Sequence, residues 1–253
     1  MTYRPKKLLN LDANPKTVKG QKRGYMTAVL YLAPADLSGW NVCPESTAGC
    51  RAACLNTAGT AGIIKFGETT NTIQIARKAK TVWYFEDRTT FLARLVNEIG
   101  RFIAKAKRAD LIPAIRLNGT SDIAWERVRV DGRSMMELFP AVQFYDYTKV
   151  TKRAMLSADN GPDWPSNYVL TYSATGENDA KAAHVLELGG TVAAVYRDLP
   201  RAIAQGENFD TGRAYTVTNA DENDLRFLDP AGTVAGLKAK GRAKADTSGF
   251  VRA

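Results

Sequence analysis

The three cysteines are the clearest group of residues in this chain that could do chemistry. Cys43, Cys50 and Cys54 lie within twelve residues in the spacing C-x6-C-x3-C, and the 199 residues after them contain no cysteine. Thiolates are the ligands that soft metal ions prefer. An odd, local group of cysteines fits a metal or redox site better than a disulfide framework. The spacing therefore indicates a soft-metal site.

Three thiolates leave the choice of metal open. A structural zinc site needs four protein ligands, and no fourth cysteine exists. The only histidine, His184, falls on the partly apolar side of a predicted helix, where we expect it to pack rather than bind zinc. A [4Fe-4S] cluster held by three cysteines keeps one iron open for a substrate or cofactor. We favour this cluster over zinc completed by Asp or water, over three thiols without metal, and over a cysteine nucleophile, which lacks a nearby base.

The elements that must position the cysteines alternate along the chain. The first predicted strand covers residues 26–33 and leads directly into the cysteine loop. Further strands are predicted at 111–117, 141–145, 168–172, 191–196, 215–218 and 233–237. Helices are predicted at 67–84, 89–107, 134–139, 149–156 and 178–188. This order is typical of a parallel sheet with crossover helices. We predict one α/β domain at 26–237, a partial (β/α) TIM-like barrel with mostly parallel strands, between irregular basic segments at 1–25 and 238–253.

Polar side chains follow the predicted strands. In such folds, binding and catalytic residues gather at the carboxyl ends of the strands. Loops are polar in any protein, so each polar residue at a strand end could also be a loop-capping residue or a surface charge. Asp146 and Lys149 could also form a local ion pair. The candidates are Asn118, Ser121, Asp122, Asp146, Tyr147, Lys149, Ser173, Arg197 and Asp198.

The charge of the chain is uneven. The net charge is +9, and residues 1–25 hold seven Lys and Arg against one Asp, while residues 238–253 hold five against one. Such ends are expected where they bind nucleic acid or another polyanion, and also where they only solubilise the chain. Trp40, Trp125 and Trp164 are candidates to stack on bases, or to pack inside the protein.

No apolar run approaches the roughly 18–20 residues that span a bilayer. The first residues also lack the apolar stretch of a signal peptide. We therefore expect a cytoplasmic protein without a membrane partner, in a compartment where thiols stay reduced.

The cysteine loop after the first strand resembles that of the radical S-adenosylmethionine (SAM) superfamily. It departs from the usual C-x3-C-x2-C spacing, and Leu55 stands where an aromatic is usual. A closer resemblance is to a family of uncharacterised bacteriophage proteins, and it runs from about residue 26 to residue 175. It rests on Cys43-Pro44, Gly49-Cys50, Cys54, Thr120-Ser121-Asp122 and Tyr145-Asp-Tyr-Thr-Lys149. The phage resemblance implies a host-cytoplasm setting.

The radical SAM resemblance implies a cluster whose open iron binds SAM and reduces it, with an electron donor, to a 5′-deoxyadenosyl radical. It implies cofactor-binding roles for Asn118, Ser121, Asp122, Tyr147, Lys149 and Ser173. With the basic ends, it favours an oxidoreductase or transferase that acts on a nucleic acid or nucleotide. The alternative is a non-catalytic nucleic-acid-binding protein with a structural iron–sulfur or zinc site.

Overall fold

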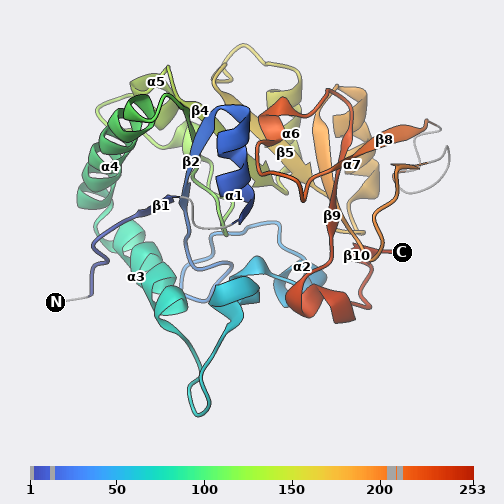
Figure 1. Ribbon diagram of the computed structural model, residues 1–253, viewed down its shortest axis with the longest axis horizontal. Coiled ribbons are helices and arrows are strands. Elements are labelled where there is room, and N and C mark those ends of the chain that lie inside the picture. Colours follow the sequence, from blue (N-terminus) through green and yellow to red (C-terminus); the bar gives the residue numbers. More distant parts are fainter. Residues whose placement is uncertain (1–2, 12–14, 204–208, 210–212) are drawn as a thin grey trace. The chain divides into compact units, whose positions relative to one another are not determined.

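The computed structural model describes residues 3–11, 15–203, 209 and 213–253 (Figure 1). Contacts between residues divide the chain into two compact units. Unit 1 comprises Met1–Pro44 and Leu55–Phe144, and unit 2 comprises Glu45–Cys54 and Tyr145–Ala253. The sequence indicated a single domain between residues 26 and 237 with a segment at each end. This predicted division stays a prediction.

The strands of unit 1 follow the order β1-β2-β3-β4. β1 (Leu9–Leu11) is antiparallel to β2 (Tyr25–Leu30), and β2 is parallel to β3 (Ile112–Arg116). β3 is parallel to the first residues of β4 (Gln143–Thr148), which continues into unit 2. β2 is buried without alternation from Met26 to Leu30, as expected for a parallel strand with both faces covered.

Unit 1 has two long helices, which contact each other. α4 (Arg88–Arg108) buries Phe91, Leu95, Ile99 and Phe102 at helical spacing and packs on β3 and β1. α3 (Thr72–Glu86) begins five residues later than predicted, because the Asn71 side chain caps it by accepting a hydrogen bond from the Gln74 N–H at 3.0 Å. Two shorter helices, α1 (Pro15–Gly20) and α5 (Met135–Leu138), complete the described helices of this unit.

The N-terminal segment was predicted to be irregular, but it contains β1 and α1. The Glu98 carboxylate of α4 accepts hydrogen bonds from the backbone N–H groups of Leu8 at 2.9 Å and Leu9 at 3.0 Å. Arg4 forms an ion pair of 2.7 Å with Asp87. These contacts join residues more than 80 positions apart. The N-terminal segment is short and has no hydrophobic periodicity, so its sequence alone did not indicate them.

A buried lysine of α3 also contacts this segment, and its lowered pKa predicts a specific pH dependence of stability. Lys80 Nζ donates to the Leu8 carbonyl at 2.6 Å, and burial lowers the pKa of Lys80 from 10.5 to about 8. Above about pH 8 the unfolded chain therefore binds more protons than the folded protein, so stability rises with pH. We expect the free energy of unfolding to gain about 2 kcal/mol between about pH 7.5 and pH 9.5. Urea titrations across this range measure the gain.

Lys80→Met should remove this rise, and Lys78→Met, at an exposed position of the same helix, should keep it. An unchanged pH dependence in Lys80→Met would assign the rise to other groups. Tyrosines of the unfolded chain begin to ionise near pH 10, which sets the upper limit of the useful range.

The strands of unit 2 that carry its core follow the order β5-β6-β9-β8-β7. β5 (Tyr168–Ser173), β6 (Thr191–Tyr196), β9 (Val234–Lys238) and β8 (Tyr215–Asn219) are parallel neighbours, and β7 (Ala202–Ile203) is antiparallel to β8. Two helices, α6 (Thr151–Ala158) and α7 (Asp179–Glu187), bury Ala154, Val185 and Leu186 in one cluster with Tyr172 and Tyr196 of the strands.

The C-terminal segment is part of this fold and not the irregular tail that we predicted. β9 extends to Lys238, and β10 (Val251–Arg252) pairs in parallel with the end of β6. Arg197, a predicted strand-end residue, donates its backbone N–H to the Arg252 carbonyl at 2.8 Å and its guanidinium to the Lys244 carbonyl at 3.0 Å. Its position therefore supports a role in holding the C-terminal segment.

Several cations of the C-terminal segment have acidic partners. Lys240 lies 2.7 Å from Asp221, and Arg252 bonds the Asp179 carboxylate at the start of α7. Lys238 lies 3.6 Å from Asp198, another predicted strand-end residue. The positive charge at this end of the sequence is thus partly neutralised within unit 2.

The α/β class with mostly parallel strands is confirmed. The finer prediction, a partial TIM-like barrel, concerns the whole chain and stays a prediction. In the part of the chain that the structure describes, no helix is both long enough and apolar enough to cross a membrane.

Candidate metal centre and strand ends

Cys43 lies in unit 1, in the loop that follows β2. Its side chain is half-buried, and its Sγ accepts a hydrogen bond from the backbone N–H of Ala35 at 3.3 Å. Ala35 has a φ of 47°, an uncommon value for a residue with a side chain. Its N–H donates to the Cys43 sulfur in this conformation. Hydrogen bonds of this kind tune the sulfur ligands of iron–sulfur clusters.

Cys50 and Cys54 lie in unit 2, on and just after the short helix α2 (Ala48–Ala52). The Thr47 side chain caps this helix by accepting from the Cys50 N–H at 3.1 Å. A Cβ on Gly49 would overlap the Ser248 side chain, so α2 packs directly against the C-terminal segment. The C-terminal segment therefore positions the two cysteines of this unit.

All three thiols are half-buried, and thiolates are ligands that soft metal ions prefer. Among the described residues, no group of three or more His, Cys, Asp and Glu side chains is arranged to hold a metal ion. Cys43 belongs to unit 1, and Cys50 and Cys54 belong to unit 2. The three-cysteine site stays a prediction that rests on residue type and spacing.

The loop after β3 lies against the Cys43 loop within unit 1. The Asp122 N–H donates to the Val42 carbonyl at 2.7 Å, and Cys43 Sγ lies 3.8 Å from the Thr120 carbonyl. The loop after β3 therefore lies beside Cys43. Asp122 itself is half-buried.

Asn118 organises this loop from within. It is 2% exposed, and its Oδ1 accepts from Ser121 Oγ at 2.8 Å, from the Ile123 N–H at 2.9 Å and from Trp125 Nε1 at 3.2 Å. Its Nδ2 donates to the Ile123 carbonyl at 2.9 Å. The hydrogen-bonding groups of Asn118 and Ser121 are therefore engaged in holding the loop.

The predicted residues of unit 2 gather around the end of β5. Ser173 is the last residue of this strand, and its carbonyl accepts from Asn178 Nδ2 at 3.1 Å. Lys149 is half-buried, and its charge acts on the nearby Tyr172 hydroxyl. Tyr147 packs with Leu237 against a small alanine cluster, which gives it a packing role.

Sequence reasoning missed a polar network centred on Tyr172. The Tyr172 hydroxyl is 3.1 Å from Thr151 Oγ1 and accepts from Asn178 Nδ2 at 3.0 Å. Burial raises the pKa of Tyr172, although these two hydrogen bonds lower it. In the sequence, Tyr172 belonged to an apolar strand, so only its place next to Ser173 pointed to the site. Asp146 is fully buried and accepts from the Tyr168 hydroxyl at 3.0 Å.

The three tryptophan candidates and the histidine lie in different environments. Trp125 is fully buried, and Trp164 stacks on Tyr168 at 5.4 Å between ring centroids. Trp40 stacks on Phe85 at 4.6 Å and remains exposed. The predicted packing role of His184 is wrong, because its side chain is 52% exposed on α7.

These features define an α/β protein with mostly parallel strands, in which polar side chains and three cysteines follow the strand ends. The chain belongs to the gene product 88 family, whose family model matches residues 7–253. This family is consistent with the resemblance to phage proteins, and no radical SAM family model matches. Comparisons with curated proteins and with solved structures gave no match.

Proposed function

We propose that this protein is an iron–sulfur protein that acts on nucleic acid. Cys43, Cys50 and Cys54 are the ligands that this function requires, and the polyanion binds the basic surface of unit 1. When bound, a [4Fe-4S] cluster with an open coordination position supplies one-electron reduction of SAM, as in the enzymes that the cysteine loop resembles. The donor set and the Ala35 N–H bond to Cys43 support the cluster.

The distribution of charge carries the nucleic-acid part of the proposal. Unit 1 holds 21 Lys and Arg against 11 Asp and Glu, a net charge of +10, whereas unit 2 holds 14 against 15, a net charge of −1. The whole positive excess of the chain therefore belongs to one unit. Such a concentration of positive charge in one unit is expected of a polyanion-binding surface.

The exposed side of α4 concentrates part of this charge. Arg101, Lys105, Lys107 and Arg108 are exposed on its last two turns. Gly100 and Ala104 are also exposed and add no bulky side chain to this part of the helix. Cations at such positions bind phosphates without reading sequence.

The hydrogen bonds of the β3 loop support a second version of this function. Asn118 and Ser121 use their side chains to hold their own loop, so they support the fold rather than a SAM molecule. This favours the alternative of a nucleic-acid-binding protein in which the metal is structural. Asp122, Lys149 and Ser173 remain the residues for cofactor contact in the enzyme version.

Anaerobic purification with iron, zinc and absorption measurements tests the metal site. We expect about four irons per chain and a cluster-type absorption band. Single substitutions Cys43→Ala, Cys50→Ala and Cys54→Ala should each lose most of the iron, whereas Ser38→Ala in the same loop should retain it. Stoichiometric zinc in a colourless protein would favour the structural alternative, and the absence of both metals from the purified protein would overturn the metal site.

A further inference from the structure

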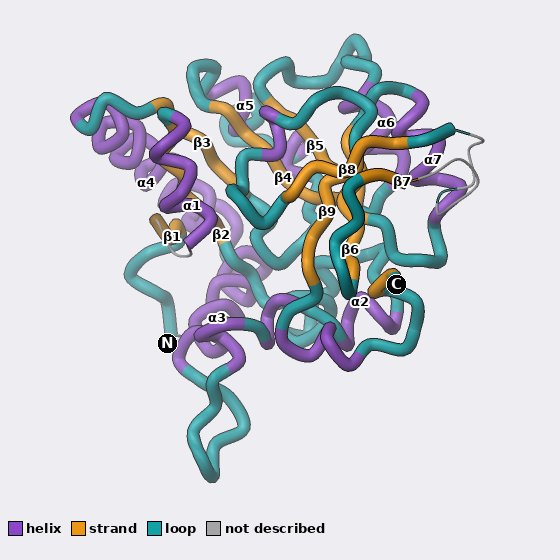
Figure 2. Tube along the Cα trace, turned by 45° about the vertical axis from the view of Figure 1, so that its right-hand side comes forward, coloured by secondary structure: helices purple, strands orange, loops and turns teal. Residues whose placement is uncertain are grey.

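The loop between residues 62 and 71 of unit 1 displays apolar side chains to solvent. Phe66 is 108% exposed, Ile63 is 67% exposed and Ile64 is 38% exposed. We call these three residues the apolar tip. The loop projects beyond the N-terminal end of α3 in both views (Figures 1 and 2). Clustered exposed apolar side chains on a soluble protein mark interaction sites.

The neck of this loop is held by side chains of α3 and its cap. Asn71 Nδ2 donates to the carbonyls of Ala61 at 3.0 Å and Ile63 at 2.9 Å, and Gln74 Nε2 donates to Ala61 at 2.8 Å. A Cβ on Gly62 would overlap the Thr57 carbonyl, so the neck also requires a glycine. The tip is thus presented on a fixed support.

A tight turn places Phe66 at the end of the loop. The Glu68 N–H donates to the Lys65 carbonyl at 3.0 Å, and Gly67 has a φ of 81°. This is the pattern of a type II turn with Phe66 at its second position. The backbone of such a turn loses little freedom when it binds, which makes Phe66 an effective anchor.

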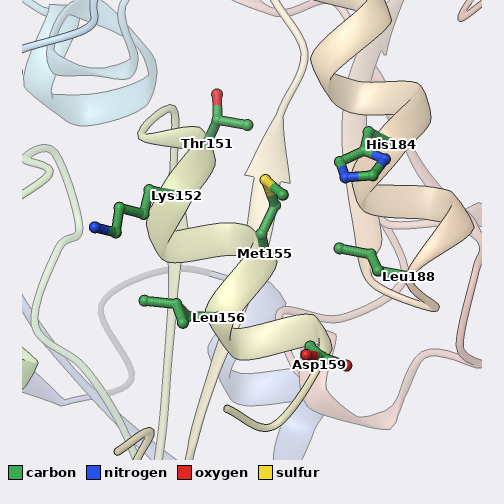
Figure 3. Close-up of a pocket in the computed structure, with 7 residues that line it drawn as sticks. All are labelled: Thr151, Lys152, Met155, Leu156, Asp159, His184 and Leu188. Carbon is green, nitrogen blue, oxygen red and sulfur yellow. The ribbon is translucent and has the colours of Figure 1, made fainter.

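Unit 2 has a partly apolar groove between α6 and α7 (Figure 3). Its volume is about 400 Å³. Its apolar lining residues are Met155, Leu156 and Leu188, and its polar ones include Lys152, Asp159 and His184. Methionine adapts to an inserted ring and makes favourable sulfur–aromatic contacts.

We propose that the apolar tip of one copy docks into the α6–α7 groove of a second copy. The charges of the two surfaces are complementary. Lys65 and Glu68 flank Phe66 in the turn, and Asp159 and Lys152 stand about 10 Å apart along α6. Lys65 pairs with Asp159, and Glu68 pairs with Lys152, which fixes the orientation of the inserted loop.

A membrane surface fits the apolar tip less well. The loop from 62 to 71 contains one Lys and one Glu, so it has no collar of cations to attract anionic lipid. Tip and groove are different surfaces, so the contact is heterologous and gives rings or open chains of copies. Neither the metal nor nucleic acid takes part in this contact.

Sedimentation velocity over a range of concentrations tests self-association. We expect the protein to form oligomers that grow with concentration, and Phe66→Asp and Met155→Asp each to be monomeric. A mixture of the two variants should form a 1:1 dimer and nothing larger, because it contains one intact tip and one intact groove. Leu228→Asp, at another exposed apolar residue of unit 2, should assemble as the unchanged protein does.

Charge reversal gives a second test that leaves the apolar residues intact. The double variant Lys152→Glu/Asp159→Lys should lose self-association, and adding Lys65→Glu/Glu68→Lys should restore it. A monomer at all concentrations would overturn the proposal, as would folded single variants whose mixture stays monomeric. Binding of the unchanged protein to phosphatidylserine vesicles that is lost in Phe66→Asp, without self-association, would assign the tip to a membrane instead.

Discussion

Replacing Asn118 with alanine is expected to lower the free energy of unfolding by about 3 kcal/mol. The side chain is buried and makes four hydrogen bonds that join Ser121, Ile123 and Trp125. Alanine would leave the buried Trp125 Nε1–H and two backbone groups without this partner, and each such loss costs about 1 kcal/mol or more. Urea denaturation monitored by tryptophan fluorescence measures the change.

Two further variants separate this loop role from a general effect of mutation. Ser121→Ala removes one of the four bonds and should cost about 1 kcal/mol. The double variant should be only slightly less stable than Asn118→Ala, because the two side chains share one bond. Asn97→Ala, at an exposed position of α4, should change stability by less than about 0.5 kcal/mol.

The same variant distinguishes the two versions of the proposed function. If Asn118 bound SAM directly and did not hold the loop, Asn118→Ala would lower SAM affinity and leave the free energy of unfolding unchanged. Calorimetric titration of SAM, carried out beside the urea titrations, measures both quantities. Unchanged stability would therefore contradict the loop role that the hydrogen bonds indicate.

The main strands and helices could be predicted because their residues follow a clear period or an apolar run. The strand predicted at 191–196 coincides with β6, and the helix predicted at 89–107 differs from α4 by one residue at each end. β1, β7 and β10 have only two or three residues. Such strands form through pairing with distant strands, which a short sequence window does not contain.

The sequence indicated which residues follow the strands, but it did not indicate their contacts. Asn118 and Ser121 were correctly placed after a strand, yet their partners depend on the way the loop turns back on itself. The Tyr172 network joins residues from β5, α6 and the cap of α7, so only the folded unit 2 brings it together. His184 was assigned to the partly apolar side of a helix, but α7 packs on α6, β5 and β6 in a way that leaves this position exposed.

Neutralising the cations of α4 is expected to have the largest effect on nucleic-acid binding. The variant Arg101→Gln/Lys105→Gln/Lys107→Gln/Arg108→Gln should lower affinity by roughly a thousandfold at low salt, at about 1 kcal/mol per cation. The slope of log K against log salt concentration should become shallower by about 0.9 for each phosphate contact that is lost. Fluorescence anisotropy with single- and double-stranded DNA at several salt concentrations measures both quantities.

A matched control removes the same charge from unit 2. The variant Lys181→Gln/Lys238→Gln/Arg242→Gln/Lys244→Gln changes the net charge of the chain by the same amount and alters only exposed residues. If the net charge of the whole chain determined binding, both variants would weaken it equally.

Glutamine is a good helix former, so α4 should remain folded in the first variant. The C-terminus of a helix carries partial negative charge, so phosphates at this end of α4 depend on the side chains that the variant removes. Equal losses in the two variants would contradict a surface on α4, and no binding by the unchanged protein would contradict the nucleic-acid function itself.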